Sequence, residues 1–185
     1  MYAIYPKFIF LFQIFSFSHV TYFSRIHIMS GVVEGPVTSS HDTTYVNNLR
    51  YAVQLLQKEN ILGIIEPINS YSVPNYYMNC YKKALSTVKE INSSHLKIML
   101  DIFHLQLIKG NIGNTIKELK EYIGHIQIAQ VPNRNEPDTE GEINYKYVLE
   151  TIKKEGYDDW IGLEYKPLVN TTEGLNWIRK FGYNL

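Results

Sequence analysis

Residues 96–130 read LKIMLDIFHLQLIKGNIGNTIKELKEYIGHIQIAQ, and this stretch decides the fold class. It opens with an apolar run of strand length, LKIMLD, that ends in Asp101, and it closes with a second such run, HIQIAQ, at residues 125–130. An apolar stripe at helical spacing separates the two runs: Ile112, Ile116, Leu119 and Ile123. The order strand, helix, strand predicts two parallel strands joined by a helical crossover.

The same pattern recurs along the chain from residue 25. Further apolar runs occupy residues 25–30 (RIHIMS), 61–66 (ILGIIE) and 160–164 (WIGLE). Helical stripes lie between or after them: Val46, Leu49, Val53 and Leu56; Tyr77, Tyr81, Leu85 and Val88; Val148, Leu149 and Ile152; and Leu175, Ile178 and Phe181. Alternating strands and helices predict an α/β fold with a parallel sheet. No GxGxxG or Walker-type loop follows the first strand, which favours a barrel over a nucleotide-binding sheet.

The number of these units predicts an incomplete barrel. A complete (β/α)8 barrel has eight strands and roughly 250 residues. We therefore predict a partial (β/α)8 TIM barrel, about five of eight β/α units, as the domain at residues 25–185. Residues 1–24 differ from it, because they are crowded with aromatic and aliphatic side chains and Lys7 is the only charged side chain before Ser24. We predict an atypical hydrophobic N-terminal segment foreign to the barrel, with a targeting segment as the alternative.

Charge and cysteine content narrow the class of partner. Eighteen basic and 18 acidic side chains balance, with no block of either sign. We therefore expect a small-molecule substrate rather than a nucleic acid or membrane partner, while association into a homo-oligomer stays open. Cys80 is the single cysteine, which excludes an intrachain disulfide and a thiolate metal cluster. This composition fits a reducing compartment and a cytoplasmic location.

Four oxygen-bearing side chains occur near the ends of successive predicted strands: Glu66, Asp101, Gln127 and Glu164. The carboxyl ends of barrel strands meet at one mouth, so we expect these side chains to converge there. Carboxylate and amide oxygens suit a hard divalent cation such as Mg²⁺ or Mn²⁺, whereas zinc sites usually include His or Cys. Each residue taken alone has a simpler explanation as a loop-entry or helix-capping group.

Several stretches of the chain resemble the hydroxypyruvate isomerases, which belong to the wider xylose-isomerase-like barrel superfamily. They are residues 25–31 (RIHIMSG), 65–69 (IEPIN), 99–104 (MLDIFH), 124–132 (GHIQIAQVP), 134–137 (RNEP), 141–145 (GEINY) and 156–165 (GYDDWIGLEY). The resemblance runs in register from about residue 25 to residue 181 and is most specific between MLDIFH and GEINY.

The resemblance implies a role for each polar residue at the predicted mouth. It implies that Glu66, Asp101, Gln127 and Glu164 bind the metal, and that the two glutamates act as general acid and base. It also implies that His104 contacts a substrate oxygen and that Arg134 meets a substrate carboxylate. The simpler alternatives are that His104 caps a loop and that Arg134 is a solvated loop residue. We expect His27 to be structural and Glu136 to be a loop charge.

The implied reaction interconverts hydroxypyruvate and 2-hydroxy-3-oxopropanoate by metal-assisted proton transfer through an enediolate, with a hydroxy-carbonyl acid as substrate. A ketose 3-epimerase is the nearest alternative, and Gln127 disfavours it because relatives of that kind usually have His there. A zinc-dependent DNA-repair nuclease would show more His ligands and a basic face. A catalytically inactive truncated remnant is the alternative outside the enzymes, because five units cannot close a normal barrel.

Overall fold

The computed structural model describes residues 24–183. The chain divides into two compact units, one up to Met99 and one from Leu100. The predicted hydrophobic segment at residues 1–24 lies outside the described residues except for Ser24, so that expectation stays a prediction. Among residues 24–183, none of the helices combines the length and apolar character needed to cross a membrane.

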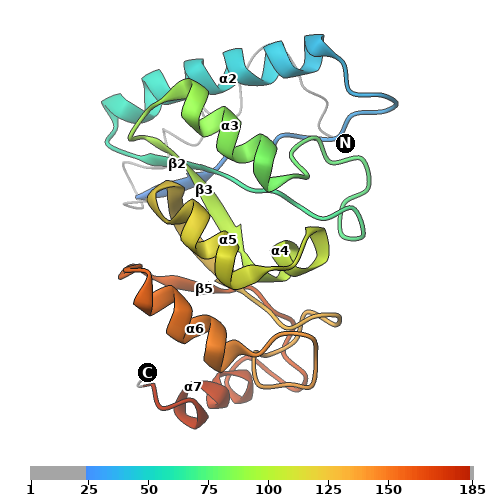
Figure 1. The fold of residues 1–185 in the computed structure, drawn as a ribbon, viewed down its shortest axis with the longest axis vertical. Helices are drawn as coiled ribbons and strands as arrows, with labels where there is room; N and C mark the ends of the chain where they lie inside the picture. Colours follow the sequence, from blue (N-terminus) through green and yellow to red (C-terminus); the bar gives the residue numbers. More distant parts are fainter. Residues whose placement is uncertain (1–23, 184–185) are drawn as a thin grey trace. The chain divides into compact units, whose positions relative to one another are not determined.

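The first unit is built around parallel strands. Strand β1 (Arg25–His27) pairs with β2 (Leu62–Ile65), and β2 pairs with the start of β3 (Leu96–Asp101). Helices α2 (Ser39–Lys58) and α3 (Tyr81–Ile91) make the two crossovers, as Figure 1 shows. The strand–helix alternation predicted for this part of the chain is therefore confirmed.

The packing of α2 on β2 explains one glycine in this unit. The buried face of α2 carries Leu49, Val53 and Leu56 of the predicted stripe. A Cβ added to Gly63 of β2 would lie 2.7 Å from Leu56 Cδ1 and 3.0 Å from Ile28 Cδ1. Leucine and isoleucine side chains thus fill the space above this strand, and a larger residue at position 63 would push α2 away from the sheet.

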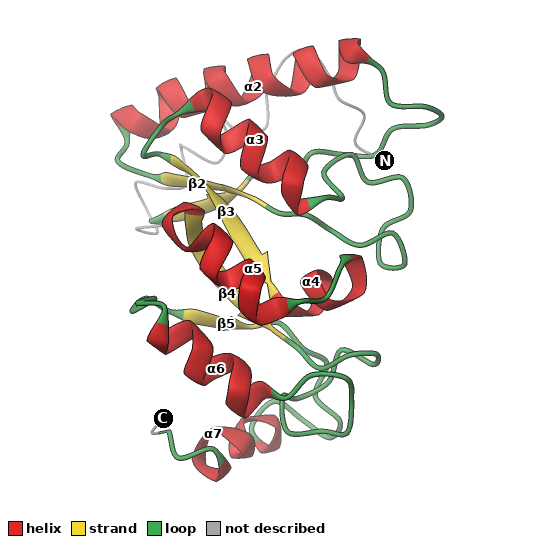
Figure 2. Cartoon of the chain, viewed as in Figure 1, coloured by secondary structure: helices red, strands yellow, loops and turns green. Residues whose placement is uncertain are grey.

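The second unit repeats the alternation. Strand β4 (Ile123–Ile128) pairs in parallel with β5 (Ile161–Leu163), with Ile126 opposite Ile161 (Figure 2). Its helical elements are α4 (Ile102–Ile108), α5 (Ile112–Leu119), the 3₁₀ turn η1 (Lys120–Tyr122), α6 (Tyr145–Lys154), the 3₁₀ turn η2 (Glu173–Leu175) and α7 (Asn176–Lys180).

The region between β3 and β4 corrects three details of the sequence prediction. Helix α4 begins directly after Asp101, although the sequence predicts a loop there. Strand β4 begins at Ile123 and ends at Ile128, two residues earlier at each end than the predicted run 125–130. Ile123 is therefore the first residue of a strand and not the last of a helical stripe, because the 3₁₀ turn η1 ends the helical segment first.

Tyr145 fixes the end of β4 to the start of α6. Its hydroxyl donates to the Ala129 carbonyl oxygen at 2.6 Å and accepts from the Ala129 backbone N–H at 3.0 Å. The side chain is almost fully buried. Because both backbone groups of Ala129 bond to this hydroxyl, they are satisfied without a neighbouring strand.

The loop that follows is organised around the side chain of Gln130. The Gln130 amide oxygen accepts from the backbone N–H groups of Val131 and Ile143 at 3.0 Å, and its nitrogen donates to the Ile143 carbonyl at 3.0 Å. Gly141 passes so close that an added Cβ would collide with the Val131 carbonyl oxygen and lie 2.5 Å from Gln130 Cγ. This approach accounts for the glycine in the GEINY stretch.

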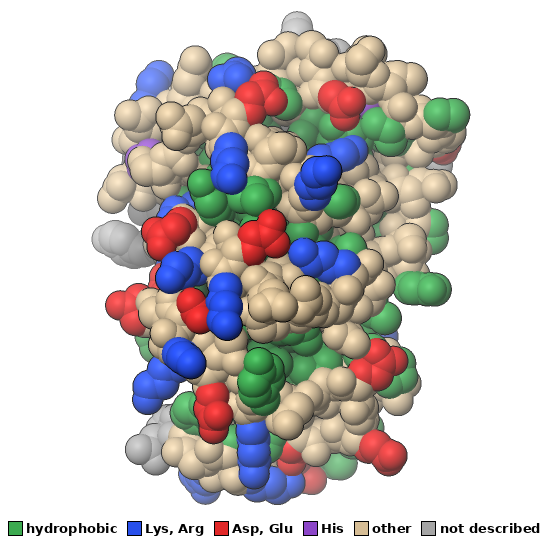
Figure 3. Space-filling model, viewed as in Figure 1, with side chains coloured by type: hydrophobic (Ala, Val, Ile, Leu, Met, Phe, Trp, Pro, Cys, Tyr) green, Lys and Arg blue, Asp and Glu red, His purple; other side chains and the backbone are tan. Residues whose placement is uncertain are grey.

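Charged side chains are mixed on the surface. Lys and Arg alternate with Asp and Glu on the face drawn in Figure 3, and they do not gather into a patch of one sign. This distribution agrees with the balanced charge of the sequence.

We expect Tyr145→Phe to lower the free energy of unfolding by about 2 kcal/mol, since it leaves a buried N–H and a buried carbonyl of Ala129 without their partner. Urea denaturation followed by circular dichroism measures the change. Tyr147→Phe is the matched control, because that side chain is 58% exposed. Equal stability of the two variants would contradict a clamping role for Tyr145.

Candidate active site

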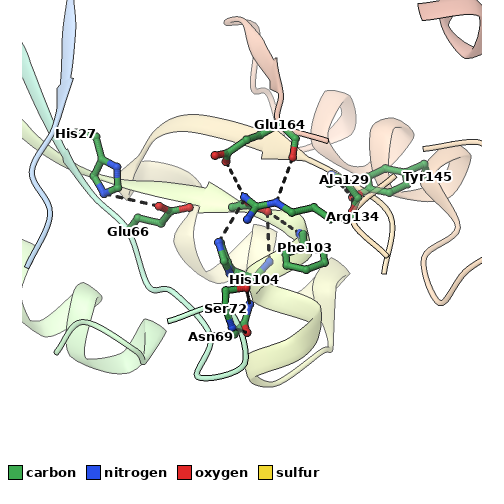
Figure 4. A network of polar contacts seen from close by, with 11 residues as sticks. His27, Glu66, Asn69, Ser72, Phe103, His104, Ala129, Arg134, Tyr145 and Glu164 are labelled. Carbon is green, nitrogen blue, oxygen red and sulfur yellow. Dashed lines mark hydrogen bonds and ion pairs between the residues drawn. The ribbon is translucent and has the colours of Figure 1, made fainter. Parts of the chain in front are cut away.

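Glu66 follows β2 in the first unit and is 4% exposed. Its Oε2 lies 3.7 Å from Nε2 of His27, the last residue of β1, as the left part of Figure 4 shows. Burial lowers the pKa of His27 to about 4, so this imidazole is neutral at neutral pH. His27 is therefore the neighbour of a predicted metal ligand, and no local feature of the sequence indicates this contact.

The chain after Glu66 is held by an asparagine turn. The Asn69 side-chain oxygen accepts from the backbone N–H groups of Tyr71 and Ser72 at 3.0 and 2.9 Å, and its nitrogen donates to Ser72 Oγ at 3.1 Å. Asparagine is suited to this turn because its short side chain reaches the backbone two residues on. The IEPIN stretch thus places a strand-end carboxylate just before a rigid loop.

The two carboxylate oxygens of Asp101 have different partners in the second unit. Its Oδ1 accepts from the backbone N–H groups of Phe103 at 2.7 Å and His104 at 3.3 Å, which makes Asp101 the N-cap of α4. Its Oδ2 faces Arg134 Nη2 at 3.4 Å and His104 Nε2 at 3.9 Å. The capping explanation and the ligand explanation are therefore compatible for this residue, because they concern different atoms.

Burial is the main influence on the pKa of Asp101, which is 0% exposed. It raises the pKa of Asp101 to about 7, with a further increase from the nearby Glu164 carboxylate, while Arg134 and the two backbone N–H groups oppose the rise. Without a metal ion, this carboxyl group therefore holds its proton to a higher pH than an exposed aspartate does.

Arg134 joins the end of β3 to the end of β5. Its Nη2 lies 2.9 Å from Glu164 Oε2 as well as 3.4 Å from Asp101 Oδ2, and its Nε donates to the Glu164 carbonyl oxygen at 3.2 Å (Figure 4). Its guanidinium carbon lies 4.9 Å from the centre of the Phe103 ring. Arg134 is accordingly an organised part of the site and not a solvated loop residue.

His104 and Gln127 complete the predicted residues of this unit. His104 lies on α4 and is 2% exposed, so it does not cap a loop. Gln127 lies on β4 opposite Gly162 of the neighbouring strand β5. Glu164 follows β5 directly and is two residues after Gly162. The Oε1 of Gln127 is buried, and among residues 24–183 it has no hydrogen-bond partner. The structure thus brings Asp101, His104, Arg134 and Glu164 together and places Gln127 on the strand beside Glu164.

Glu136 is a buried loop residue with a structural role. It is 6% exposed, and its Oε1 accepts from the Leu168 backbone N–H at 2.9 Å. Gly174 packs against it, since an added Cβ there would lie 3.0 Å from the same oxygen. Glu136 lies in a loop, as predicted, and its buried carboxylate holds the chain after β5.

The donor set fits a hard divalent cation. Asp101 and Glu164 supply carboxylate oxygens, and Gln127 supplies a neutral carbonyl oxygen that is buried without a hydrogen-bond donor among the described residues. Carboxylate and amide oxygens are the ligands of Mg²⁺ and Mn²⁺. A buried carbonyl oxygen without a donor is costly unless something positive faces it.

Comparison with known protein families agrees with this geometry. The family model described as "Xylose isomerase-like TIM barrel" matches residues 20–181. The chain belongs to this family. The match confirms the fold class predicted from the sequence, an α/β fold that forms part of a (β/α)8 barrel.

The curated relatives are isomerases by name. A Drosophila melanogaster protein provisionally named hydroxypyruvate isomerase is 45% identical over 161 residues, which cover 87% of this chain and 61% of the relative. The hydroxypyruvate isomerase of Escherichia coli K12 is 44% identical over 135 residues, which cover 73% of this chain and 52% of that protein. The 2-oxo-tetronate isomerase of Cupriavidus necator is 37% identical over 158 residues, with coverage of 85% and 60%. The chain thus spans about half to six tenths of the length of these relatives.

A solved structure supports the same fold. The crystal structure of an "AP endonuclease, family 2" from Brucella melitensis superimposes with a TM-score of 0.87 at 32% identity, and the match covers 92% of this chain and 66% of that one.

The raised pKa of Asp101 predicts a pH dependence of stability in the metal-free protein. Between the unfolded pKa of 3.8 and about 7 the folded state holds more protons than the unfolded state at this carboxyl group, so stability falls as the pH rises through that window. His27 contributes the opposite slope, because its lowered pKa makes the folded state hold fewer protons between about 4 and 6.5.

The comparison of wild type with Asp101→Asn isolates the first effect. Asparagine keeps an oxygen that can cap α4 but does not titrate, so we expect the stability lost between pH 4.5 and 7.5 to shrink by more than about 1 kcal/mol. Urea denaturation at both pH values in the presence of a chelator measures it, with the exposed Asp158→Asn as control. An unchanged pH dependence in Asp101→Asn would show that Asp101 does not carry it.

Proposed function

We propose that this chain carries the metal- and base-bearing part of an isomerase that interconverts hydroxypyruvate and 2-hydroxy-3-oxopropanoate. The observation that carries the proposal is the cluster in which Arg134 lies between Asp101 and Glu164, with buried His104 beside Asp101. It combines carboxylates for proton transfer with a guanidinium for an acidic substrate. The names of the relatives support the same reaction class.

Asp101, Gln127 and Glu164 are the proposed ligands of one Mg²⁺ or Mn²⁺ ion, and Glu66 remains the fourth ligand that the sequence predicts. When bound, such an ion supplies a Lewis acid that stabilises negative charge on the substrate oxygens. The three carboxylates and the amide contribute only oxygen atoms, which is the donor chemistry that these ions select.

The two glutamates are the proposed proton carriers. One removes a proton from C3 of hydroxypyruvate, and a proton returns to C2, while the hydroxyl proton moves from the C3 oxygen to the C2 oxygen. The intermediate is an enediolate, and no electron acceptor is needed because the substrate and the product are isomers. Glu164 has a half-exposed side chain, so solvent and substrate can reach it, whereas Glu66 is buried.

His104 and Arg134 are the proposed substrate-binding groups. The buried imidazole of His104 can hydrogen-bond a substrate oxygen and relay the hydroxyl proton. The planar guanidinium of Arg134 can bind the substrate carboxylate in a bidentate manner. A substrate such as 2-oxo-tetronate also carries a carboxylate, so it belongs to the same proposed class. A ketose sugar has no carboxylate, and Gln127 further disfavours the epimerase alternative.

We expect wild type to show Mn²⁺-dependent turnover. We expect Glu164→Gln to lower kcat at least about 100-fold, because an amide cannot act as the general base. The assay follows hydroxypyruvate consumption and deuterium incorporation at C3 in D₂O by NMR, with and without chelator. Glu140→Gln, which removes an exposed charge near the same loop, is the matched control.

Three outcomes are informative. Full activity in Glu164→Gln would remove Glu164 as a base. A folded wild-type chain that binds Mn²⁺ without exchange or turnover would support the inactive-remnant alternative. Turnover of ketoses but not of hydroxypyruvate or 2-oxo-tetronate would favour an epimerase.

A further inference from the structure

One atom of Arg134 serves both carboxylates of the second unit. Nη2 lies 2.9 Å from Glu164 Oε2 and 3.4 Å from Asp101 Oδ2. The other oxygen of Asp101 accepts two backbone N–H groups at the start of α4. Oδ2 is therefore the oxygen of Asp101 that a cation can take without uncapping the helix, and Arg134 faces that oxygen.

The rest of Arg134 is held by contacts that do not involve Nη2. Its backbone N–H donates to the Gln130 carbonyl at 2.8 Å, and its carbonyl accepts from the Lys166 N–H at 2.7 Å. Its φ of +58° is uncommon for a side chain other than glycine and indicates that the loop imposes this conformation. The side chain is 23% exposed, so its end can turn toward solvent while the backbone stays in place.

A divalent cation bound to Asp101 and Glu164 would take Asp101 Oδ2, the oxygen that Arg134 contacts, and would lie close to the guanidinium. Two cations within about 4 Å repel each other strongly in a partly buried site, and here both would share the Asp101 oxygen that does not cap α4. We propose that Arg134 is a built-in competitor of the metal ion, and that metal binding displaces its guanidinium end, which then binds the carboxylate of the substrate. This inference rests on the proposed metal-dependent isomerase function.

The proposal predicts that metal and substrate bind in a preferred order. Without metal, Nη2 is engaged with protein carboxylates and is a poor ligand for another anion. With metal bound, the guanidinium no longer contacts the Asp101 and Glu164 carboxylates and is available to bind the carboxylate of a ligand. By linkage, if the metal ion tightens the binding of a carboxylate-bearing ligand by some factor, that ligand must tighten the binding of the metal ion by the same factor.

The test measures Mn²⁺ affinity by calorimetry in wild type, Arg134→Met and Arg50→Met. Methionine removes the charge but keeps a long side chain. Arg50 forms an exposed ion pair with Glu90 at 3.1 Å in the first unit, so Arg50→Met makes the same change in net charge without touching the site. We expect Arg134→Met to bind Mn²⁺ about ten-fold more tightly than wild type, a change of about 1.4 kcal/mol, and Arg50→Met to match wild type.

A second measurement compares two ligands, first in wild type. In wild type, glycerate should tighten Mn²⁺ binding several-fold more than glyceramide, which has the same hydroxyl groups and no carboxylate. In Arg134→Met that difference should disappear. This measurement keeps the test decisive if Arg134→Met does not fold.

The outcomes separate this inference from the proposed function. Mn²⁺ binding that is unchanged or weakened in Arg134→Met, or an equal effect of glycerate and glyceramide in wild type, would overturn the competition while leaving the metal site in place. Absence of Mn²⁺ binding in all proteins would overturn both.

Discussion

The buried carboxylate of Asp101 must be stabilised on both oxygens, and much of the second unit follows from that requirement. Removing a carboxylate from water is expensive unless hydrogen bonds or an opposite charge replace the lost hydration. Two backbone N–H groups at the start of α4 stabilise Oδ1, at 2.7 and 3.3 Å. The helix thereby gains a cap, and β3 passes into α4 with no intervening loop. Oδ2 is left to face a cation, and the position of Arg134 meets that need.

A long irregular segment places Arg134, and side chains rather than secondary structure make that segment rigid. Tyr145 bonds both backbone groups of Ala129, and the Gln130 amide bonds backbone groups on both sides of the loop. The close passage of Gly141 leaves no room for another side chain there. A loop built in this way can hold an arginine in a left-handed backbone conformation, as sites that need exact placement often do.

The sequence could place Glu66, Asp101 and Glu164 at strand ends because each ends or follows an apolar run, whose period is readable without coordinates. It predicted α4 poorly, since a strand that passes directly into a helix leaves no turn residue, although an aspartate just before IFHLQLI is itself an N-cap signal. It predicted Glu136 as a loop charge but not that its carboxylate is buried against the chain after β5. Burial of such a charge depends on residues more than 30 positions away and is not a local property of the sequence.

Charge balance at the proposed site explains why Arg134 would exchange the Asp101 and Glu164 carboxylates for the carboxylate of the substrate. Asp101 and Glu164 in their ionised forms, a divalent cation bound to them and the Arg134 guanidinium sum to one positive charge. A neutral sugar would leave that sum unchanged, whereas a hydroxy-carbonyl acid adds one negative charge that a neutral amide such as Gln127 cannot offset. The guanidinium can offset it only if it is no longer paired with Asp101 and Glu164, and the metal ion is the group that can replace it there. The same arginine that stabilises the metal-free carboxylates would then select an acidic substrate, so stability of the empty site and specificity of the filled one would depend on a single side chain.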